Sequence, residues 1–116
     1  MMATTRTVAP HIQKILDEMV RLLIQHYQPE RIVLYGSLAW GDFSENSDID
    51  LLIVKETDET PLERRVRVRR IVADKSRHIP FSPLVITPQE LEQRLALGDP
   101  FYRKILFQGT ELYARS

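Results

Sequence analysis

Two aspartates, Asp48 and Asp50, are the residues of this sequence whose type and spacing most clearly suggest chemistry. They stand two residues apart in a run typical of a β-strand, so their side chains should project from one face, about 6–7 Å apart. Two buried carboxylates repel each other and lose hydration, and a hard divalent cation removes that cost. The spacing therefore predicts a metal site at Asp48 and Asp50.

A glycine–serine pair, Gly36 and Ser37, follows the run Arg31–Tyr35, which reads as a buried strand because its residues are β-branched, apolar and aromatic. The backbone must turn after that strand, and glycine allows a ligand to approach closely because no Cβ intervenes. Ser37 adds a hydroxyl where a helical turn would begin, a place that favours anions through backbone N–H groups. A triphosphate here, opposite a metal at the aspartates, is the arrangement that in-line attack on phosphorus requires.

The elements that must position these residues follow from hydrophobic periodicity and from the prolines and glycines. Thr87 and Glu90 form a capping box at one helix start, and Pro80 and Pro83 favour an edge position for the strand that contains them. We expect strands over residues 31–35, 49–55, 81–87 and 111–113 and helices over residues 10–27, 62–77, 88–98 and 100–107. This order predicts a mixed α/β protein whose helices pack on a mixed β-sheet.

Length and composition restrict the classes of protein that remain. At 116 residues we expect one domain over 1–116, with a helical N-terminal segment at 10–28 and a core at 31–114. The 16 basic and 16 acidic residues cancel, so a global attraction to nucleic acid is not expected. The absence of cysteine excludes disulfides and thiolate zinc sites. No apolar run reaches the ~20 residues needed to cross a bilayer, so we expect a soluble cytoplasmic protein without a membrane partner.

The segment from Leu34 to Val54 resembles the signature of the minimal nucleotidyltransferases of the DNA polymerase β superfamily, which is Gly-Ser, a spacer and then Asp-x-Asp in a strand. The match includes the Ser37–Gly41 turn and Ser47 before the first aspartate, and runs that start at Thr87 and Pro100 extend it to about residues 31–113. The resemblance implies the nucleotidyltransferase fold. It also implies transfer of a nucleoside monophosphate, AMP when the donor is Mg–ATP, onto a hydroxyl with release of pyrophosphate.

Residue by residue, the resemblance implies that Gly36, Ser37 and Ser47 bind the nucleotide, and that Asp48 and Asp50 are catalytic and bind Mg²⁺. The sequence departs from the family at two positions. Ser82 stands where relatives usually carry a third carboxylate, and a serine cannot act as a carboxylate base at neutral pH. Three alternatives follow from the missing carboxylate. Another group supplies the base, the transfer reaction is slow, or the domain binds a nucleotide without transferring any part of it. Trp40 stands where many relatives carry arginine, which removes one phosphate contact.

The resemblance further implies a protein partner. A chain of this length has no room for the additional domain with which larger relatives bind their acceptor, and stand-alone proteins of this type are often antitoxins that adenylylate a helical HEPN ribonuclease toxin. Two alternatives stay open: a catalytically weak or inactive module that binds a nucleotide or a partner, which Ser82 favours, and RNA binding by the arginine-rich helix over residues 62–77. The sequence does not decide whether the protein forms a homo-oligomer.

Overall fold

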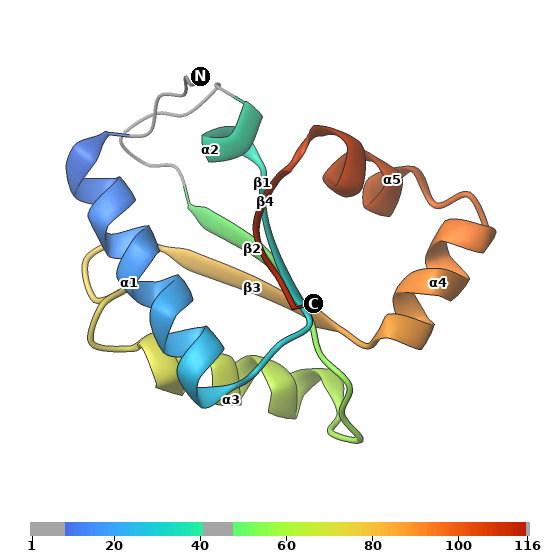
Figure 1. Cartoon of the computed structure of the whole chain (residues 1–116), viewed down its shortest axis with the longest axis horizontal. Helices are drawn as coiled ribbons and strands as arrows, with labels where there is room; N and C mark the ends of the chain where they lie inside the picture. The colour runs from blue at the N-terminus through green and yellow to red at the C-terminus, as the bar shows by residue number, and fades with distance from the viewer. Residues whose placement is uncertain (1–8, 41–47, 116) are drawn as a thin grey trace.

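A four-stranded mixed β-sheet lies at the centre of the protein, and helices cover both of its faces (Figure 1). The computed structural model describes residues 9–40 and 48–115. The strands are β1 (Arg31–Tyr35), β2 (Ile49–Val54), β3 (Phe81–Ile86) and β4 (Thr110–Ala114), in the order β3-β2-β1-β4. β1 pairs antiparallel with β2 and β4, whereas β2 and β3 run parallel. The mixed α/β fold and the edge position of the proline-containing strand, both expected from the sequence, are confirmed.

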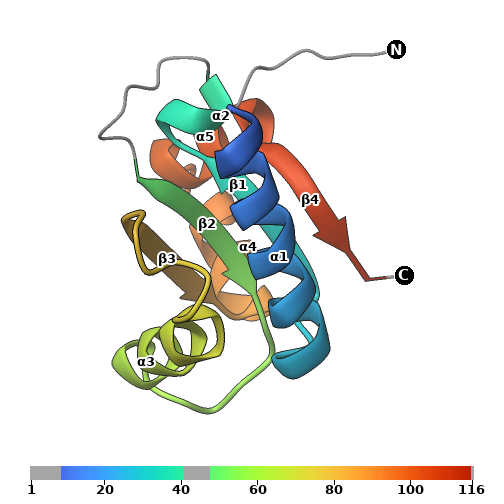
Figure 2. The same cartoon turned by 90° about the vertical axis from the view of Figure 1, so that its left-hand side faces the viewer.

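The helices divide into two layers. They are α1 (Pro10–His26), α2 (Ser37–Trp40), α3 (Pro61–Val72), α4 (Pro88–Ala96) and α5 (Pro100–Gln108). α1 and α3 lie on one side of the sheet and α4 and α5 on the other, as Figures 1 and 2 show from two directions. The short α2 follows β1 directly, at the end of the sheet where β1 ends and β2 begins.

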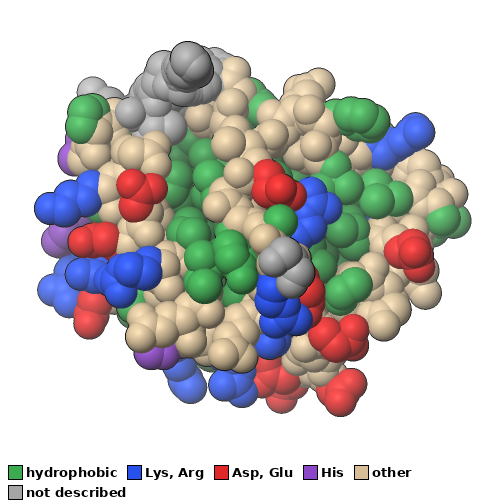
Figure 3. All heavy atoms as spheres, viewed as in Figure 1, with side chains coloured by type: hydrophobic (Ala, Val, Ile, Leu, Met, Phe, Trp, Pro, Cys, Tyr) green, Lys and Arg blue, Asp and Glu red, His purple; other side chains and the backbone are tan. Residues whose placement is uncertain are grey.

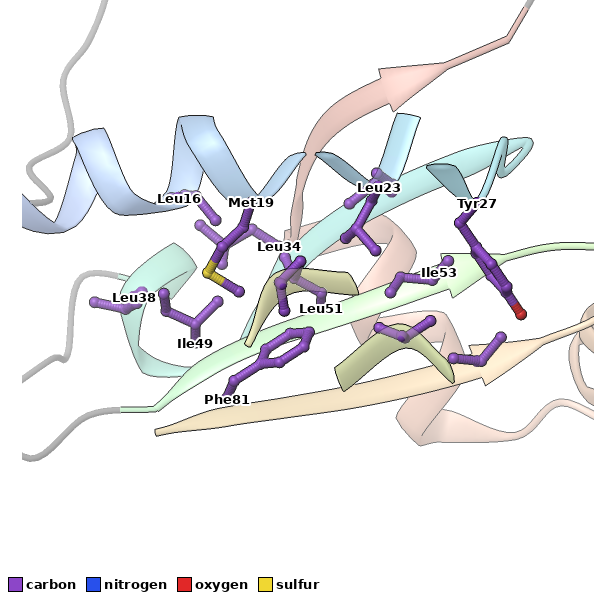
Figure 4. Packing of buried hydrophobic residues seen from close by; sticks show 14 residues of the cluster. Leu16, Met19, Leu23, Tyr27, Leu34, Leu38, Ile49, Leu51, Ile53 and Phe81 are labelled. Atoms are coloured by element: carbon purple, nitrogen blue, oxygen red, sulfur yellow. The ribbon is translucent and has the colours of Figure 1, made fainter. Parts of the chain in front are cut away.

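Alternation along β2 explains both layers, because successive side chains of a strand point to opposite faces. Ile49, Leu51 and Ile53 pack in the core with α1 and α3, and Figure 4 shows this packing against the apolar side of α1. Leu52 and Val54 pack in a second cluster with α4 and α5. β2 is therefore apolar on both faces beyond its first residues, as is typical of a strand in the interior of a sheet.

The helix expected over residues 62–77 is shorter than predicted. α3 ends at Val72, and the backbone N–H groups of Lys75 and Ser76 both donate to the Val72 carbonyl, which closes a turn instead of continuing the helix. Val72 is also the last residue of this helix that is buried in the core. No glycine or proline marks this end, and helical stability in proteins comes mainly from packing of an apolar face, so the loss of buried positions explains it.

Arg64 joins α3 to α4 and the outer edge of β3. Its guanidinium donates to both carboxylate oxygens of Glu90, at 2.8 and 3.3 Å, and to the carbonyls of Glu59 and Val85. The Arg64 side chain is only 6% exposed, so it is buried although it belongs to an arginine-rich helix. Glu90 also completes the predicted capping box with Thr87. Within residues 9–40 and 48–115, no helix has the length and hydropathy required to span a membrane.

Candidate functional site

The backbone at Gly36 lies directly against the carboxylate of Asp50. Tyr35, the last residue of β1, pairs with Asp50 of β2, so the next residue turns beside that side chain. Gly36 has a φ of 78°, in the left-handed region that other residues rarely adopt. A Cβ built on Gly36 would lie 2.2 Å from Oδ2 of Asp50. Glycine is therefore required at position 36 both for the backbone conformation and for the space that the carboxylate occupies.

Asp48, Asp50 and Ser82 come together at the start of β2. Ser82 of β3 is the register partner of Asp50 in the parallel pair, and its hydroxyl donates a hydrogen bond of 3.0 Å to Oδ2 of Asp48. Leu52 and Leu84 are the next residues on the face of the sheet that carries Asp50 and Ser82. They pack with α4 and α5, so the two polar side chains lie on the α4 and α5 side of the sheet. The residue that stands at the position of the third carboxylate thus touches the first of the two aspartates.

The electrostatics of the pair favour a cation. Burial raises the pKa of Asp50 to about 6, and the negative charge of Asp48 adds to that rise. Burial also raises the pKa of Tyr35 to about 12, with contributions from Asp50 and Tyr102. A raised carboxyl pKa means that the ionised form of Asp50 is disfavoured. A bound cation would stabilise the ionised form and lower that pKa again.

The donor set at this place fits Mg²⁺. This ion prefers oxygen ligands and is usually held by one or two carboxylates together with substrate phosphates and water. The part of the chain that the structure describes contains no cluster of three or more His, Cys, Asp or Glu side chains suited to a metal. Asp48 and Asp50 supply two carboxylates, the number with which Mg²⁺ is usually held when it is shared with a substrate's phosphates.

Ser37 begins α2 and is half-buried. The N–H groups of Ala39 and Trp40 donate to the Gly36 carbonyl at 3.1 and 3.0 Å, so these two amides close the turn and are not donors to a ligand. The expectation that N–H groups at the start of this helical turn favour an anion is not decided by these two bonds and stays a prediction. Ser47, which was predicted to bind the nucleotide, lies outside the described residues, as does Gly41.

Helix α5 contributes side chains that the sequence motif does not indicate. The Phe101 ring meets the Tyr35 ring edge to face, with 5.9 Å between centroids. Nζ of Lys104 lies 4.2 Å from the centroid of the Trp40 ring. The Nε1 atom of Trp40 is buried and has no hydrogen-bond partner among the described residues, so this end of the indole is packed inside the protein. The three-residue spacing of Phe101 and Lys104 predicts a shared helix face, but not what that face contacts.

Comparisons with known proteins bear on the family and the fold of this chain. Residues 12–113 match the family model described as a nucleotidyltransferase domain. A Methanocaldococcus jannaschii protein named "Putative protein adenylyltransferase MJ0604" is 44% identical over 48 residues, which are 40% of this chain and 48% of that protein. The match thus spans less than half of the length of that relative.

Two solved structures share the fold. A crystal structure of a putative nucleotidyltransferase from Sulfolobus solfataricus superposes with a TM-score of 0.60 at 18% identity, over 97% of this chain and 94% of that one. Another crystal structure, also of a putative nucleotidyltransferase, superposes with a TM-score of 0.55 at 27% identity, over 84% of this chain and 97% of that one.

Proposed function

This chain belongs to the nucleotidyltransferase domain family, and from that premise we propose that it binds a nucleoside triphosphate with Mg²⁺ and transfers the nucleoside monophosphate to a hydroxyl group. The observation that carries the proposal is the placement of Asp48 and Asp50 at the turn that Gly36 makes after β1. ATP is the proposed donor and a protein the proposed acceptor, because the M. jannaschii relative is named as a protein adenylyltransferase. That the acceptor is a helical HEPN toxin, with this protein as its antitoxin, rests on the family resemblance alone.

The proposed reaction is an in-line displacement. The acceptor hydroxyl gives its proton to water and its oxygen forms a bond to the α-phosphorus, while the bond from that phosphorus to the oxygen shared with the β-phosphate breaks and pyrophosphate leaves. Asp48 and Asp50 would hold Mg²⁺, which would neutralise phosphate charge and orient the phosphates. Gly36 keeps the carboxylate of Asp50 in place because it leaves room for it. Ser82 holds Asp48 through its hydrogen bond.

The serine at position 82 favours a second candidate function. In that case the protein is a module that binds a nucleotide or a partner and transfers the nucleoside monophosphate slowly or not at all. The Ser82 hydroxyl cannot accept the acceptor proton as a carboxylate would. The RNA-binding candidate has less support, because Arg64 and Arg67 of α3 are paired with Glu90 and Glu59. On the face shown in Figure 3, basic and acidic side chains are interspersed and form no continuous basic surface.

Binding can be tested by calorimetry with Mg–ATP on the full chain. We expect wild type to bind, and Asp48→Asn and Asp50→Asn to lose binding because the cation loses a charged ligand. Asp58→Asn is the matched control, since Asp58 is exposed and follows the other end of β2. Unchanged Mg–ATP binding by Asp48→Asn would refute the proposal.

Transfer can be tested by incubating the protein with α-labelled ATP, Mg²⁺ and the protein encoded by the neighbouring gene. Label on that protein, absent with Asp48→Asn, is the result expected of an enzyme. Ser82→Asp restores a carboxylate beside Asp50, and we expect it to increase transfer. A chain that binds Mg–ATP but transfers no label, with or without Ser82→Asp, is the binding module.

A further inference from the structure

The proposed site has a surplus of negative charge. A triphosphate brings several negative charges, Mg²⁺ neutralises two of them, and Asp48 and Asp50 add two more. Sites that move phosphoryl or nucleotidyl groups therefore usually supply a lysine or arginine from the protein as well. The sequence motif contains no such residue between Gly36 and Trp40. The structure can be searched for a cation that another element brings to this turn.

Lys104 of α5 is a cation that the fold places beside α2. Its Nζ lies 4.2 Å from the centroid of the Trp40 ring. Ser37 and Trp40 are the first and last residues of α2, and residues three apart in a helical turn are neighbours on its surface. In Figures 1 and 2, α2 and α5 lie at the same end of the sheet. The ammonium group therefore lies against α2, the helix that begins with Ser37, and its four-carbon stem lets it move.

Another residue of α5 links the helix that carries Lys104 to the strand that carries Asp50. Phe101, one turn before Lys104, contacts Tyr35, and Tyr35 is the register partner of Asp50. One face of α5 thus extends from the neighbourhood of Asp50 to α2. Lys104 is exposed and forms no ion pair with any carboxylate in the described ranges, so its charge is available to a ligand.

We infer that Lys104 binds the phosphates of the nucleotide, and that Trp40 holds the lysine side chain at the site when no nucleotide is bound. The inference rests on the proposed function and adds a residue to it. A lysine over an aromatic ring at an exposed site is held weakly, whereas a charged hydrogen bond to phosphate is stronger. The ammonium should therefore leave the indole when the triphosphate arrives.

This exchange has an optical signal, because Trp40 is the only tryptophan of the chain. Its fluorescence can be followed while the full chain is titrated with Mg–ATP, with Mg–tripolyphosphate and with adenosine. Lys104→Met removes the charge but keeps a long apolar side chain. Arg103→Met is the matched control, since Arg103 is the adjacent cation of α5 and is also exposed.

We expect Mg–tripolyphosphate to change Trp40 fluorescence in wild type and in Arg103→Met but not in Lys104→Met. We expect Lys104→Met to bind Mg–ATP about tenfold more weakly in calorimetry, the usual effect of losing one charged hydrogen bond. Arg103→Met should bind as wild type does. Circular dichroism of the variants will show that all are folded.

Two results would overturn the inference. If Lys104→Met binds Mg–ATP and Mg–tripolyphosphate as tightly as wild type while Asp48→Asn does not, Lys104 has no phosphate role and the proposed function stands. If adenosine alone changes the fluorescence and Mg–tripolyphosphate does not, Trp40 stacks on the base and the assignment of Lys104 is wrong. Absence of Mg–ATP binding to wild type would instead refute the proposed function, and the inference with it.

Discussion

Replacing Gly36 by alanine tests the link between the turn after β1 and the carboxylate of Asp50. The new Cβ would lie 2.2 Å from Oδ2 of Asp50 and 3.1 Å from its Cγ, so the whole side chain must rotate away. Gly98 provides a matched control: its φ of 74° is nearly that of Gly36, and a Cβ there would meet nothing within 4 Å. Both substitutions impose the same backbone strain, but only Gly36→Ala displaces the proposed ligand.

The expected magnitudes follow from these geometries. A left-handed conformation costs an alanine roughly 1–2 kcal/mol, of which about 0.4–1 kcal/mol is offset because the unfolded chain loses conformational freedom. Gly98→Ala should therefore destabilise the protein by about 1 kcal/mol. Gly36→Ala adds the cost of moving Asp50 out of its rotamer, roughly 0.5–1.5 kcal/mol, for a total of about 2 kcal/mol. In a chain of this length 1 kcal/mol corresponds to a fall in Tm of about 4 °C.

Thermal unfolding followed by circular dichroism measures the loss of stability of each variant. Calorimetry measures its affinity for Mg–ATP. We expect Gly98→Ala to bind Mg–ATP as wild type does, and Gly36→Ala to bind at least about tenfold more weakly, as when the support of a metal ligand is lost. The reasoning is refuted if Gly36→Ala and Gly98→Ala bind Mg–ATP equally well, because the carboxylate would then not depend on the space at Gly36.

Two further predictions concern stability. Arg64→Met should lower the free energy of unfolding in urea by about 2–3 kcal/mol, because the Glu90 carboxylate and two backbone carbonyls lose the guanidinium that donates to them; the exposed Arg65→Met is the control, and an equal effect of both would contradict this role. The pKa of Asp50 is raised to about 6, so between the ordinary aspartate pKa and pH 6 the folded state holds a proton that the unfolded state has released, and stability should fall as the pH rises through that interval. Asp50→Asn should abolish this fall in urea titrations at pH 4–6, and an unchanged pH profile would exclude Asp50 as its source.

The fold was predictable where local signals determine it. The prolines at the first positions of α1, α4 and α5 and the capping box at Thr87 mark helix starts that depend on neighbouring residues only. The apolar runs of β1 and β2 likewise define strands without reference to the rest of the chain. The end of α3 was not predictable in this way, because Val72 is the last residue of α3 that the core holds.

The candidate site was predictable in its motif and not in its neighbours. Ser82 lies beside Asp50 through the register of β2 with β3, and its hydrogen bond to Asp48 depends on side-chain positions that no spacing gives. The approach of Gly36 to Asp50 depends on the register of β1 with β2. The contact of Lys104 with Trp40 joins residues far apart in the chain and arises only when α5 packs on the sheet.

The outer edge of β3 bears on how this protein can associate with other chains. The carbonyls of Pro80 and Ile86 face β2, so alternation turns the backbone groups of Pro83 and Val85 outward. Pro83 has no N–H to offer, and Arg64 occupies the Val85 carbonyl. A strand added to this edge could not form the full set of backbone hydrogen bonds. Native sheets use such incomplete edges to avoid edge-to-edge aggregation. A peptide or second copy that extends this sheet must therefore add to β4.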